Sequence, residues 1–202
     1  LPIDLPRPIA STFGSTDNLA QELPLLAIRG FGQSEVQMVP LHMAMVAGAV
    51  ANGGQMMAPY AVEATYDQAG RVLDETSPSV WKTPISPQTA EIERQLMIGV
   101  AERGTASCCI ALNGGIPVAA KTGTAQLGDP SNPDLSHAWI IAFAPADNPQ
   151  YAVSVVLTNV QSTADVAATG GRLAGPIAKG MLDFLLTGPG AQPVTPAPEA
   201  GG

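Results

Sequence analysis

The residues best suited to chemistry lie in one short stretch, Lys121-Thr122-Gly123-Thr124, which follows the apolar or small residues 118–120. The β-branched start of this stretch predicts a strand, and a strand interior is an unfavourable place for an unpaired ammonium group. A lysine beside two hydroxyls is suited to binding an anion, such as the terminal carboxylate of a peptide-like ligand. We therefore expect Lys121 and the hydroxyls of Thr122 and Thr124 to converge on such a carboxylate.

The backbone of the same stretch suggests how a ligand would lie. If the strand is at the edge of a sheet, a peptide-like ligand can add beside it as one more antiparallel strand. Gly123 then permits close approach, and the N–H of Thr124 can form half of an oxyanion hole. Lys121 and Thr124 are thus the candidate catalytic residues, and all four are candidate substrate-binding residues. The alternative, which the spacing leaves open, is a lysine whose amine extends from a strand end into water.

Other chemistries fit the sequence less well. A phosphate-binding G-x-x-x-x-G-K-T loop would need glycine at Ala120, and Pro117 removes one of the N–H groups that such a loop presents. Neither His42 nor His137 has a Cys or carboxylate at ligand spacing, so we expect no metal site. The adjacent Cys108 and Cys109 are expected to be two buried thiols, because disulfides between neighbours are strained.

The composition describes a globular, rather apolar chain. Hydrophobic residues make up 46% of the 202 residues, and the net charge of -8 argues against binding nucleic acid. No apolar stretch is long enough to cross a bilayer. The chain begins at Leu1 without a basic leader, so we expect it to be a segment of something longer.

The candidate residues require a framework, which the C-terminal half of the sequence predicts best. Three strands are expected at 118–126, 138–144 and 151–160, and the turn residues 147–150 predict that the last two pair antiparallel. A helix is expected between Ser86-Pro87 and Gly104, and another at 173–186. The apolar stripes expected to pack inward are Ile92, Leu96 and Val100 in the first of these helices, and Leu173, Ile177, Met181 and Leu185 in the second.

The N-terminal half is less regular. Residues 1–39 are rich in Pro, Gly and Ser and are expected to form a loop-rich lead-in without regular elements. A helix that is apolar nearly all round, and therefore buried, is expected from Pro40 to the Asn52-Gly53-Gly54 stop. Residues 56–75 are expected to form two strands around a turn at 67–70.

The tetrad Lys121–Thr124 resembles the KTG motif of the serine D,D-transpeptidases, β-lactamases and related penicillin-recognising enzymes. Four further stretches are similar, in the same order, to segments of class B-type penicillin-binding proteins. The resemblance covers about residues 28–186 and corresponds to the C-terminal part of a transpeptidase domain. The stretches are GQSEVQMVPLHMAMVAGAVANGG, ISPQTAEIERQLMIGVAERGTA, HAWIIAFAPADNPQYAVSVVLTN and GGRLAGPIAKGMLDFLL.

The resemblance implies an α+β, β-lactamase/transpeptidase-like fold in three layers, with an antiparallel sheet flanked by helices. Residues 1–186 are expected to hold its last three strands, its C-terminal helix and part of its helical layer. The N-terminal strands and the nucleophile helix are expected to be absent from this chain. Residues 187–202, rich in Pro, Gly and Ala, are expected to be a disordered tail.

The family's nucleophile motifs have only poor matches here. The one Ser-x-x-Lys, Ser79 to Lys82, precedes Pro84, which disfavours a helix. The STFG stretch that begins at Ser11 has no lysine, and Thr16-Asp17-Asn18 only chemically resembles Ser-x-Asn and lies too near the GQ segment. We therefore expect this segment to supply the substrate-docking strand, to lack the nucleophile, and to be inactive alone.

The function implied by the resemblance is that of a peptidoglycan D,D-transpeptidase acting through a serine acyl-enzyme, which requires no metal and no organic cofactor. Its implied partners are stem peptides ending in D-Ala-D-Ala, β-lactams, the upstream half of the same protein and a cell-wall synthesis or division complex. Its implied location is extracytoplasmic, with a membrane anchor in an N-terminal segment outside this chain. A non-catalytic β-lactam sensor and a structural partner-binding domain of the same fold remain alternatives.

Overall fold

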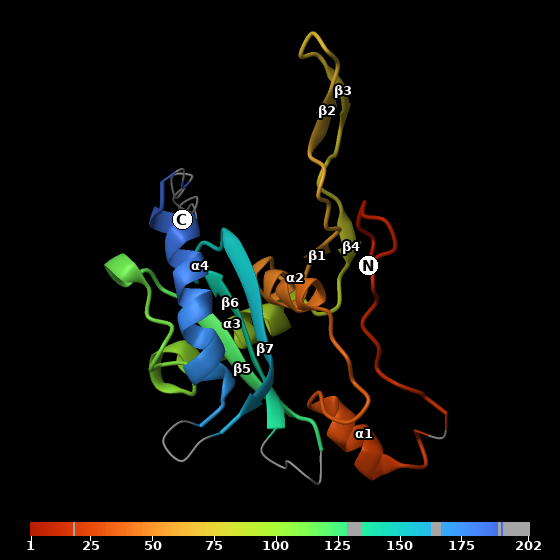
Figure 1. Cartoon of the computed structure of the whole chain (residues 1–202), viewed down its shortest axis with the longest axis vertical. Coiled ribbons are helices and arrows are strands. Elements are labelled where there is room, and N and C mark those ends of the chain that lie inside the picture. Colours follow the sequence, from red (N-terminus) through yellow and green to blue (C-terminus); the bar gives the residue numbers. More distant parts are fainter. Residues whose placement is uncertain (18, 129–134, 163–166, 190, 192–202) are drawn as a thin grey trace.

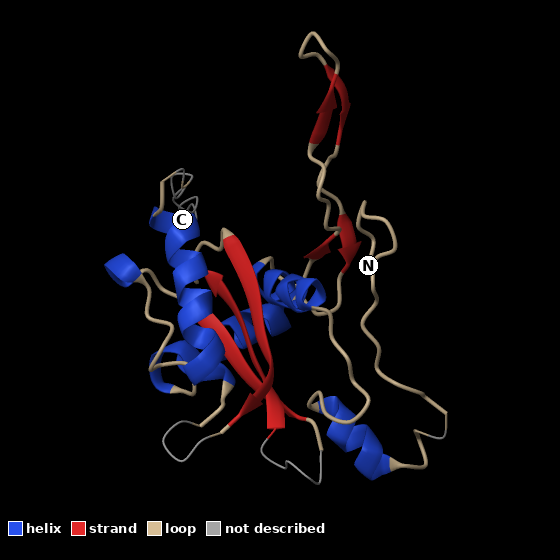
Figure 2. Cartoon of the chain, viewed as in Figure 1, coloured by secondary structure: helices blue, strands red, loops and turns tan. Residues whose placement is uncertain are grey.

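A three-stranded antiparallel sheet forms the centre of the computed structural model, which describes residues 1–17, 19–128, 135–162, 167–189 and 191. Helices lie on both faces of this sheet, and a long β-hairpin projects away from it (Figure 1). Figure 2 shows the same arrangement by element type. The elements are α1 (Leu23–Gly30), α2 (Pro40–Ala51), β1 (Met56–Met57), β2 (Ala64–Tyr66), β3 (Val72–Glu75), β4 (Val80–Lys82), α3 (Pro87–Arg103), a 3₁₀ turn (Asn113–Gly115), β5 (Ala119–Gln126), β6 (Leu135–Ala144), β7 (Tyr151–Gln161), a π-helical turn (Gly170–Ala174) and α4 (Gly175–Thr187).

The central sheet has the order β5-β6-β7, and its three strands confirm the three predicted from sequence. β6 and β7 pair antiparallel, as the turn residues between them predicted. In the β5–β6 pair, Lys121 lies opposite Ile141 and Gly123 lies opposite Trp139. Within the described residues β5 pairs only with β6, so it is an edge strand of this sheet.

Side chains alternate between the two faces of the sheet, and each face has its own core. On one face Ala120 and Ile140 pack in a cluster with Leu182 of α4. On the other face Ala119 and Phe143 pack with Ala47 of α2 and Met97 of α3. The observed architecture is therefore an antiparallel sheet between two helical layers, which is the predicted α+β arrangement.

The local sequence explains where the predicted helices α2 and α3 begin. The Ser86 hydroxyl accepts a hydrogen bond from the Thr89 N–H at 3.1 Å and caps α3, and Pro87 occupies the first turn. Pro40 occupies the same position in α2, which confirms that predicted helix. The expectation that α2 is wholly buried is wrong: only Ala47 and Ala49 are fully buried, and most of its residues are half-exposed.

The prediction that residues 1–39 lack regular structure is wrong at one point, because residues 23–30 form α1. Pro24 in its first turn favours the helix start, and leucines dominate its sequence. At 8 residues the helix is too short for an apolar period to stand out. The isolated bridge between Thr12 and Gln37 is a further regular contact in this segment.

The apolar stripes predicted for α3 and α4 are right only in part. Val100 and Leu185 pack against the core as predicted, whereas Ile177 and Met181 of α4 are exposed. Ile92 and Leu96 are 62% and 60% exposed, whereas α3 buries smaller or more flexible residues. In α4 the buried stripe is displaced by one residue from the prediction. Small side chains allow each helix to lie closer to the sheet, which the count of large apolar residues did not reveal. The residues actually buried are Ala90, Met97 and Ala101 in α3, and Gly175, Ala178, Leu182 and Leu186 in α4.

The hairpin predicted around residues 67–70 is present as β2 and β3, which pair antiparallel. A second small sheet, β1 with β4, supports its base and was not predicted. The Asp4 carboxylate accepts hydrogen bonds from the N–H groups of Ala61 (2.7 Å) and Val62 (2.9 Å), and these lower the Asp4 pKa. The N-terminal segment is thereby tied to the hairpin base.

Most of the tail that was predicted to be disordered, residues 187–202, lies outside the described residues, at positions 190 and 192–202. Among the described residues, no helix has the length and apolar character needed to cross a membrane.

Replacement of Leu182 by alanine should lower the free energy of unfolding by about 2–5 kcal/mol, because this fully buried side chain joins α4 to the sheet. Chemical denaturation of the gene product that carries this chain would measure the change. Phe184→Ala is the matched control, since Phe184 lies on the same helix and is 64% exposed. Similar losses for both variants would contradict the packing described for α4.

Candidate docking strand and the groove beside it

The predicted site residues Lys121, Thr122, Gly123 and Thr124 lie in the middle of β5. Lys121 and Thr124 are exposed, and Thr122 and Gly123 are half-buried. Because β5 is an edge strand, one row of its backbone polar groups is left open to a further strand. The structure therefore provides the edge that the predicted docking mode requires.

Two hydrogen bonds show which backbone groups face this open edge. The N–H and C=O of a residue in an antiparallel strand point to the same side. The Leu127 N–H donates to the Leu135 carbonyl at 3.1 Å, so odd-numbered residues of β5 face β6. The Thr124 carbonyl instead accepts a hydrogen bond from the Gln33 side-chain amide at 3.2 Å, on the opposite side. The N–H of Thr124 consequently points to the open edge, as its predicted oxyanion role requires.

The side chains of the motif do not share one face of the sheet. Thr122 faces the α4 side with Ala120, and strand alternation places Lys121 and Gly123 on the α2 side. The Lys121 amine nevertheless returns to the edge, because Nζ donates to the Thr122 carbonyl at 2.6 Å. The side chains of Lys121 and of the two threonines start on opposite faces of the strand. The amine and the hydroxyls can therefore contact the same carboxylate only if that carboxylate lies at the open edge.

A groove of about 600 Å³ runs beside this edge on the α2 side of the sheet. Gly123 and Thr124 line it, whereas Lys121 and Thr122 are not among its lining residues. We name it the edge groove. Its lining consists of Phe31–Ser34 and Val36–Met38 in the loop after α1, Pro40 and Met43 at the start of α2, Gly123–Gln126 of β5 with the following Leu127, and His137, Trp139, Val156 and Thr158 on the sheet.

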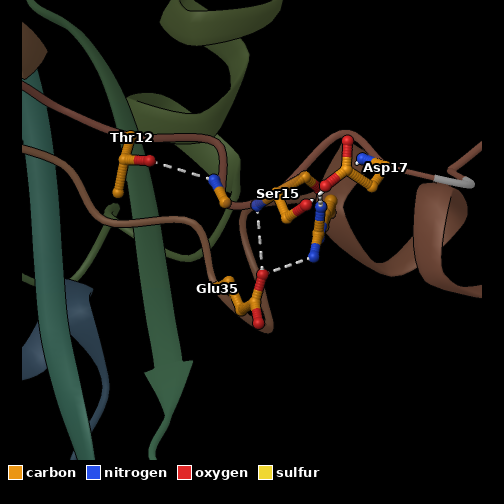
Figure 3. Close-up of polar contacts among 6 residues, drawn as sticks. Thr12, Ser15, Asp17 and Glu35 are labelled. Atoms are coloured by element: carbon orange, nitrogen blue, oxygen red, sulfur yellow. Dashed lines mark hydrogen bonds and ion pairs between the residues drawn. The ribbon is translucent and has the colours of Figure 1, made fainter.

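The loop wall of the edge groove is held by Arg29, the last basic residue of α1. Its side chain is 3% exposed, and its guanidinium donates to the Glu35 carboxylate at 2.5 Å and to the Ser15 carbonyl. The Phe13 ring lies 5.9 Å from the same guanidinium. Figure 3 shows Glu35 also accepting from the Ser15 N–H, so one ion pair connects the N-terminal segment with the loop that carries Gln33.

Two glycines, Gly170 and Gly171, allow the segment before α4 to pack closely against β5 and the turn after α3. A Cβ at Gly170 would lie 1.9 Å from the Trp139 carbonyl oxygen and 2.7 Å from that of Gly123. A Cβ at Gly171 would lie 2.0 Å from the Thr105 carbonyl oxygen. Such contacts are sterically impossible, so both positions require glycine. They fix the height of the segment above the docking strand.

The prediction of two buried thiols is wrong. The structure joins Cys108 and Cys109 by a disulfide bond, and Cys108 is exposed. The pair lies in the loop between α3 and β5, where the Cβ of Cys109 packs against Gly175. The prediction weighed the strain of a bond between neighbours but had no means to locate the loop at the surface.

The two serine motifs that lack a suitable lysine have structural roles. The expectation that no helix runs on from Ser79 is confirmed, because residues 80–82 form β4 and the Lys82 amine lies 4.7 Å from the Trp81 ring centroid. The Ser11 hydroxyl accepts from the Val39 N–H at 3.0 Å and lies 2.9 Å from His42 Nδ1. Ser11 thus supports the start of α2.

Several residues at the site escaped prediction. Gln33, Arg29, Gly170 and Thr105 contact or position β5 from distant parts of the chain, and no local pattern marks such contacts. The only signal available was the order of the similar stretches, since three of these residues lie within them. Among the described residues, no group of three or more His, Cys, Asp or Glu side chains is placed to hold a metal ion.

Comparison with known proteins supports this description. The model of the family "Penicillin binding protein transpeptidase domain" matches residues 9–183. The chain is 37% identical over 174 residues to peptidoglycan D,D-transpeptidase PbpA of Mycolicibacterium smegmatis, covering 85% of this chain and 34% of that protein. It is 36% identical over 163 residues to PbpA of Mycobacterium tuberculosis, covering 81% of this chain and 32% of the relative.

Solved structures give the same result. The ceftriaxone acyl-enzyme complex of penicillin-binding protein A from M. tuberculosis matches with a TM-score of 0.77 and 35% identity, over 89% of this chain and 38% of that one. The fold is that of the penicillin-binding protein transpeptidase domains as a class. The chain belongs to the penicillin-binding protein transpeptidase family. It spans about a third of the length of the curated relatives it matches.

Replacement of Gly170 by alanine should destabilise the fold by about 1–3 kcal/mol and displace β5, because its Cβ would collide with two backbone oxygens that cannot rotate away. Denaturation and the amide chemical shifts of β5 would measure both effects. Gly180→Ala is the control: it lies in α4 with open space around it, so alanine should be neutral or stabilising by up to about 1 kcal/mol. A Gly170 variant as stable as the control would refute the contact.

His42 should make stability fall in mild acid. Burial lowers its pKa, and the nearby positive charge of Lys82 adds to the effect. The unfolded chain therefore binds more protons just below the ordinary histidine pKa, so the free energy of unfolding should decrease as pH falls through that range. Denaturation at a series of pH values should show this slope, and His42→Gln should flatten it. If the slope is unchanged in the His42→Gln variant, a group other than His42 causes the pH dependence of stability.

Proposed function

We propose that this chain is the substrate-docking part of a peptidoglycan D,D-transpeptidase. The observation that carries the proposal is the open edge of β5, where the Thr124 N–H, the Thr122 carbonyl and the Lys121 amine lie together beside the edge groove. Family membership and the names of the relatives support it, since PbpA is described as a D,D-transpeptidase. Neither a sensor nor a purely structural role has comparable support.

In the proposed reaction, a stem peptide ending in D-Ala-D-Ala adds along β5 as an antiparallel strand. Lys121 supplies positive potential, and the hydroxyls of Thr122 and Thr124 bind the terminal carboxylate. Gly123 permits close approach of the ligand backbone. The N–H of Thr124 stabilises negative charge on the carbonyl oxygen of the penultimate D-Ala as it is attacked.

The covalent step uses a serine outside this docking strand. Its Oγ bonds to the penultimate D-Ala carbonyl carbon, the C–N bond breaks, and terminal D-Ala leaves with the proton that the serine gives up through a base. An amine of a second stem then takes the acyl group and restores the serine. Acyl-enzyme complexes of M. tuberculosis penicillin-binding protein A with ceftriaxone and penicillin G support the same chemistry here.

We further propose that this chain alone does not turn over substrate. Its sequence contains no Ser-x-Asn, and its only Ser-x-x-Lys ends on β4, away from a helix. The complete gene product would act outside the cytoplasmic membrane, where its substrate lies, and would be membrane-anchored by a segment outside this chain. β-Lactams would acylate the same serine, and a cell-wall synthesis or division complex would be its partner.

Replacement of Lys121 by alanine in the gene product that carries this chain should slow acylation by a labelled penicillin at least tenfold. A tenfold loss corresponds to about 1.4 kcal/mol in the barrier and reflects lost attraction for the ligand carboxylate. The second-order acylation rate would be measured by gel fluorescence. Lys82→Ala is the matched control, because Lys82 is exposed on β4 and lies over Trp81.

The proposal fails if Lys121→Ala is acylated as fast as the Lys82 variant. It also fails if the unaltered gene product is not acylated at all. Capture of a stem-peptide analogue without release of product would instead favour a β-lactam sensor.

A further inference from the structure

One hydroxyl outside the motif contacts the docking strand directly. Thr105 Oγ1 lies 2.5 Å from Thr122 Oγ1, so one of the two hydroxyls donates a hydrogen bond to the other. Thr105 lies in the turn after α3, 17 residues before Thr122 in the sequence. Neither the motif nor the proposed chemistry assigns a role to this residue.

The turn that carries Thr105 is firmly placed. The N–H groups of Gly104 and Ala106 both donate to the Val100 carbonyl, at 3.1 and 3.3 Å. The Ser107 hydroxyl donates to the Gly104 carbonyl at 2.8 Å, which closes the turn. Ala106 itself is fully buried. Thr105 is therefore exposed to solvent but has a fixed backbone.

A second contact presses the same turn against β5. The position of Gly171 admits no Cβ, because the Thr105 carbonyl oxygen lies in the space that it would occupy. The same virtual Cβ lies 3.5 Å from Thr122 Cγ2. Gly171 thus closes over the Thr105–Thr122 pair from the α4 side, and the two hydroxyls are held together rather than meeting by chance.

Counting donors shows what this pair can do for an anion. A threonine hydroxyl has one proton to donate and two lone pairs that accept. If Thr122 donates to Thr105, it offers only lone pairs to a ligand and repels a carboxylate. If Thr105 donates instead, the single proton of Thr122 is free, and its donation is strengthened because its oxygen already accepts a hydrogen bond. A bound carboxylate selects the second arrangement.

We propose that Thr105 is a positioning residue that donates its hydroxyl proton to Thr122 and thereby directs the Thr122 proton toward the terminal carboxylate of the ligand. It fixes the side-chain rotamer of Thr122 at the same time. The Lys121 amine holds the Thr122 backbone carbonyl, so the two contacts constrain Thr122 from both its backbone and its side chain. This inference rests on the proposed function of the docking strand.

The test compares two ligands that differ only at the terminal group. Acetyl-D-Ala-D-Ala and its C-terminal carboxamide would each compete with a labelled penicillin for acylation of the gene product that carries this chain. The measured quantity is the ratio of the two inhibition constants, amide over acid. A merely structural loss changes both constants equally and leaves this ratio unchanged.

Thr105→Val removes the hydroxyl at nearly constant volume and should lower the ratio by about 3- to 10-fold, because the charge-assisted bond to the acid is weakened selectively. Thr105→Ser should restore it to within about twofold. Ser107→Ala is the matched control, since it removes a hydroxyl from the same turn without touching Thr122. In a Thr122→Val background, Thr105→Val should have no further effect on the ratio.

An unchanged ratio in Thr105→Val, failure of serine to restore it, or an equal change in the Ser107 control would overturn the proposal. If the Thr105→Val variant does not fold, the same amide-to-acid ratio is measured for Thr105→Ala, alone and in the Thr122→Val background, with the same expected changes. Failure of the proposed function has a different signature: the unaltered protein would then not distinguish acid from amide, and Lys121→Ala would not alter that.

Discussion

The docking strand must be held rigidly while one of its edges stays unpaired. An exposed strand edge can pair with unintended partners, and hydrogen bonds to two carbonyls of β5 reduce that risk. Lys121 places a charge over the Thr122 carbonyl, and the Gln33 amide occupies the carbonyl of Thr124. Two carbonyls of the edge, those of Thr122 and Thr124, thus each accept a hydrogen bond from a cationic or neutral donor, while the Thr124 N–H faces outward. The open edge consequently favours a ligand that brings acceptors.

Rigidity comes from close packing by residues with little or no side chain. Ala119 and Ala120 are fully buried on opposite faces of β5, which lets helical layers approach from both sides. Gly170 and Gly171 carry this further, because their backbone touches the carbonyl oxygens of neighbouring segments directly. Contacts of this kind tolerate no added atom, so the height of the strand is fixed by backbone against backbone rather than by adjustable side chains.

The same packing explains which parts of the fold could be predicted from sequence. The three strands of the central sheet and the starts of α2 and α3 depend on local features, such as the capping Ser86, and these were located correctly. The short α1 and the small β1–β4 sheet were missed. The buried faces of α3 and α4 depend on which surface fits the sheet. In α4 the small Ala178 is buried, whereas the larger Ile177 is exposed. The motif located the docking strand, but its supports are tertiary contacts. Thr105 and Gln33 reach β5 from turns whose placement no local pattern encodes.

The charge of the chain poses a problem for an anionic ligand, since its net charge is -8. At physiological ionic strength charges are screened over about 8 Å, so the immediate surroundings of the edge matter more than the total. Among the ion pairs of the described residues none involves Lys121, and the partner of its amine is the uncharged Thr122 carbonyl. An ammonium with three donors keeps two for a ligand when one is used in this way. Its positive charge is therefore available to a carboxylate, whereas a carboxylate partner within the protein would have cancelled it.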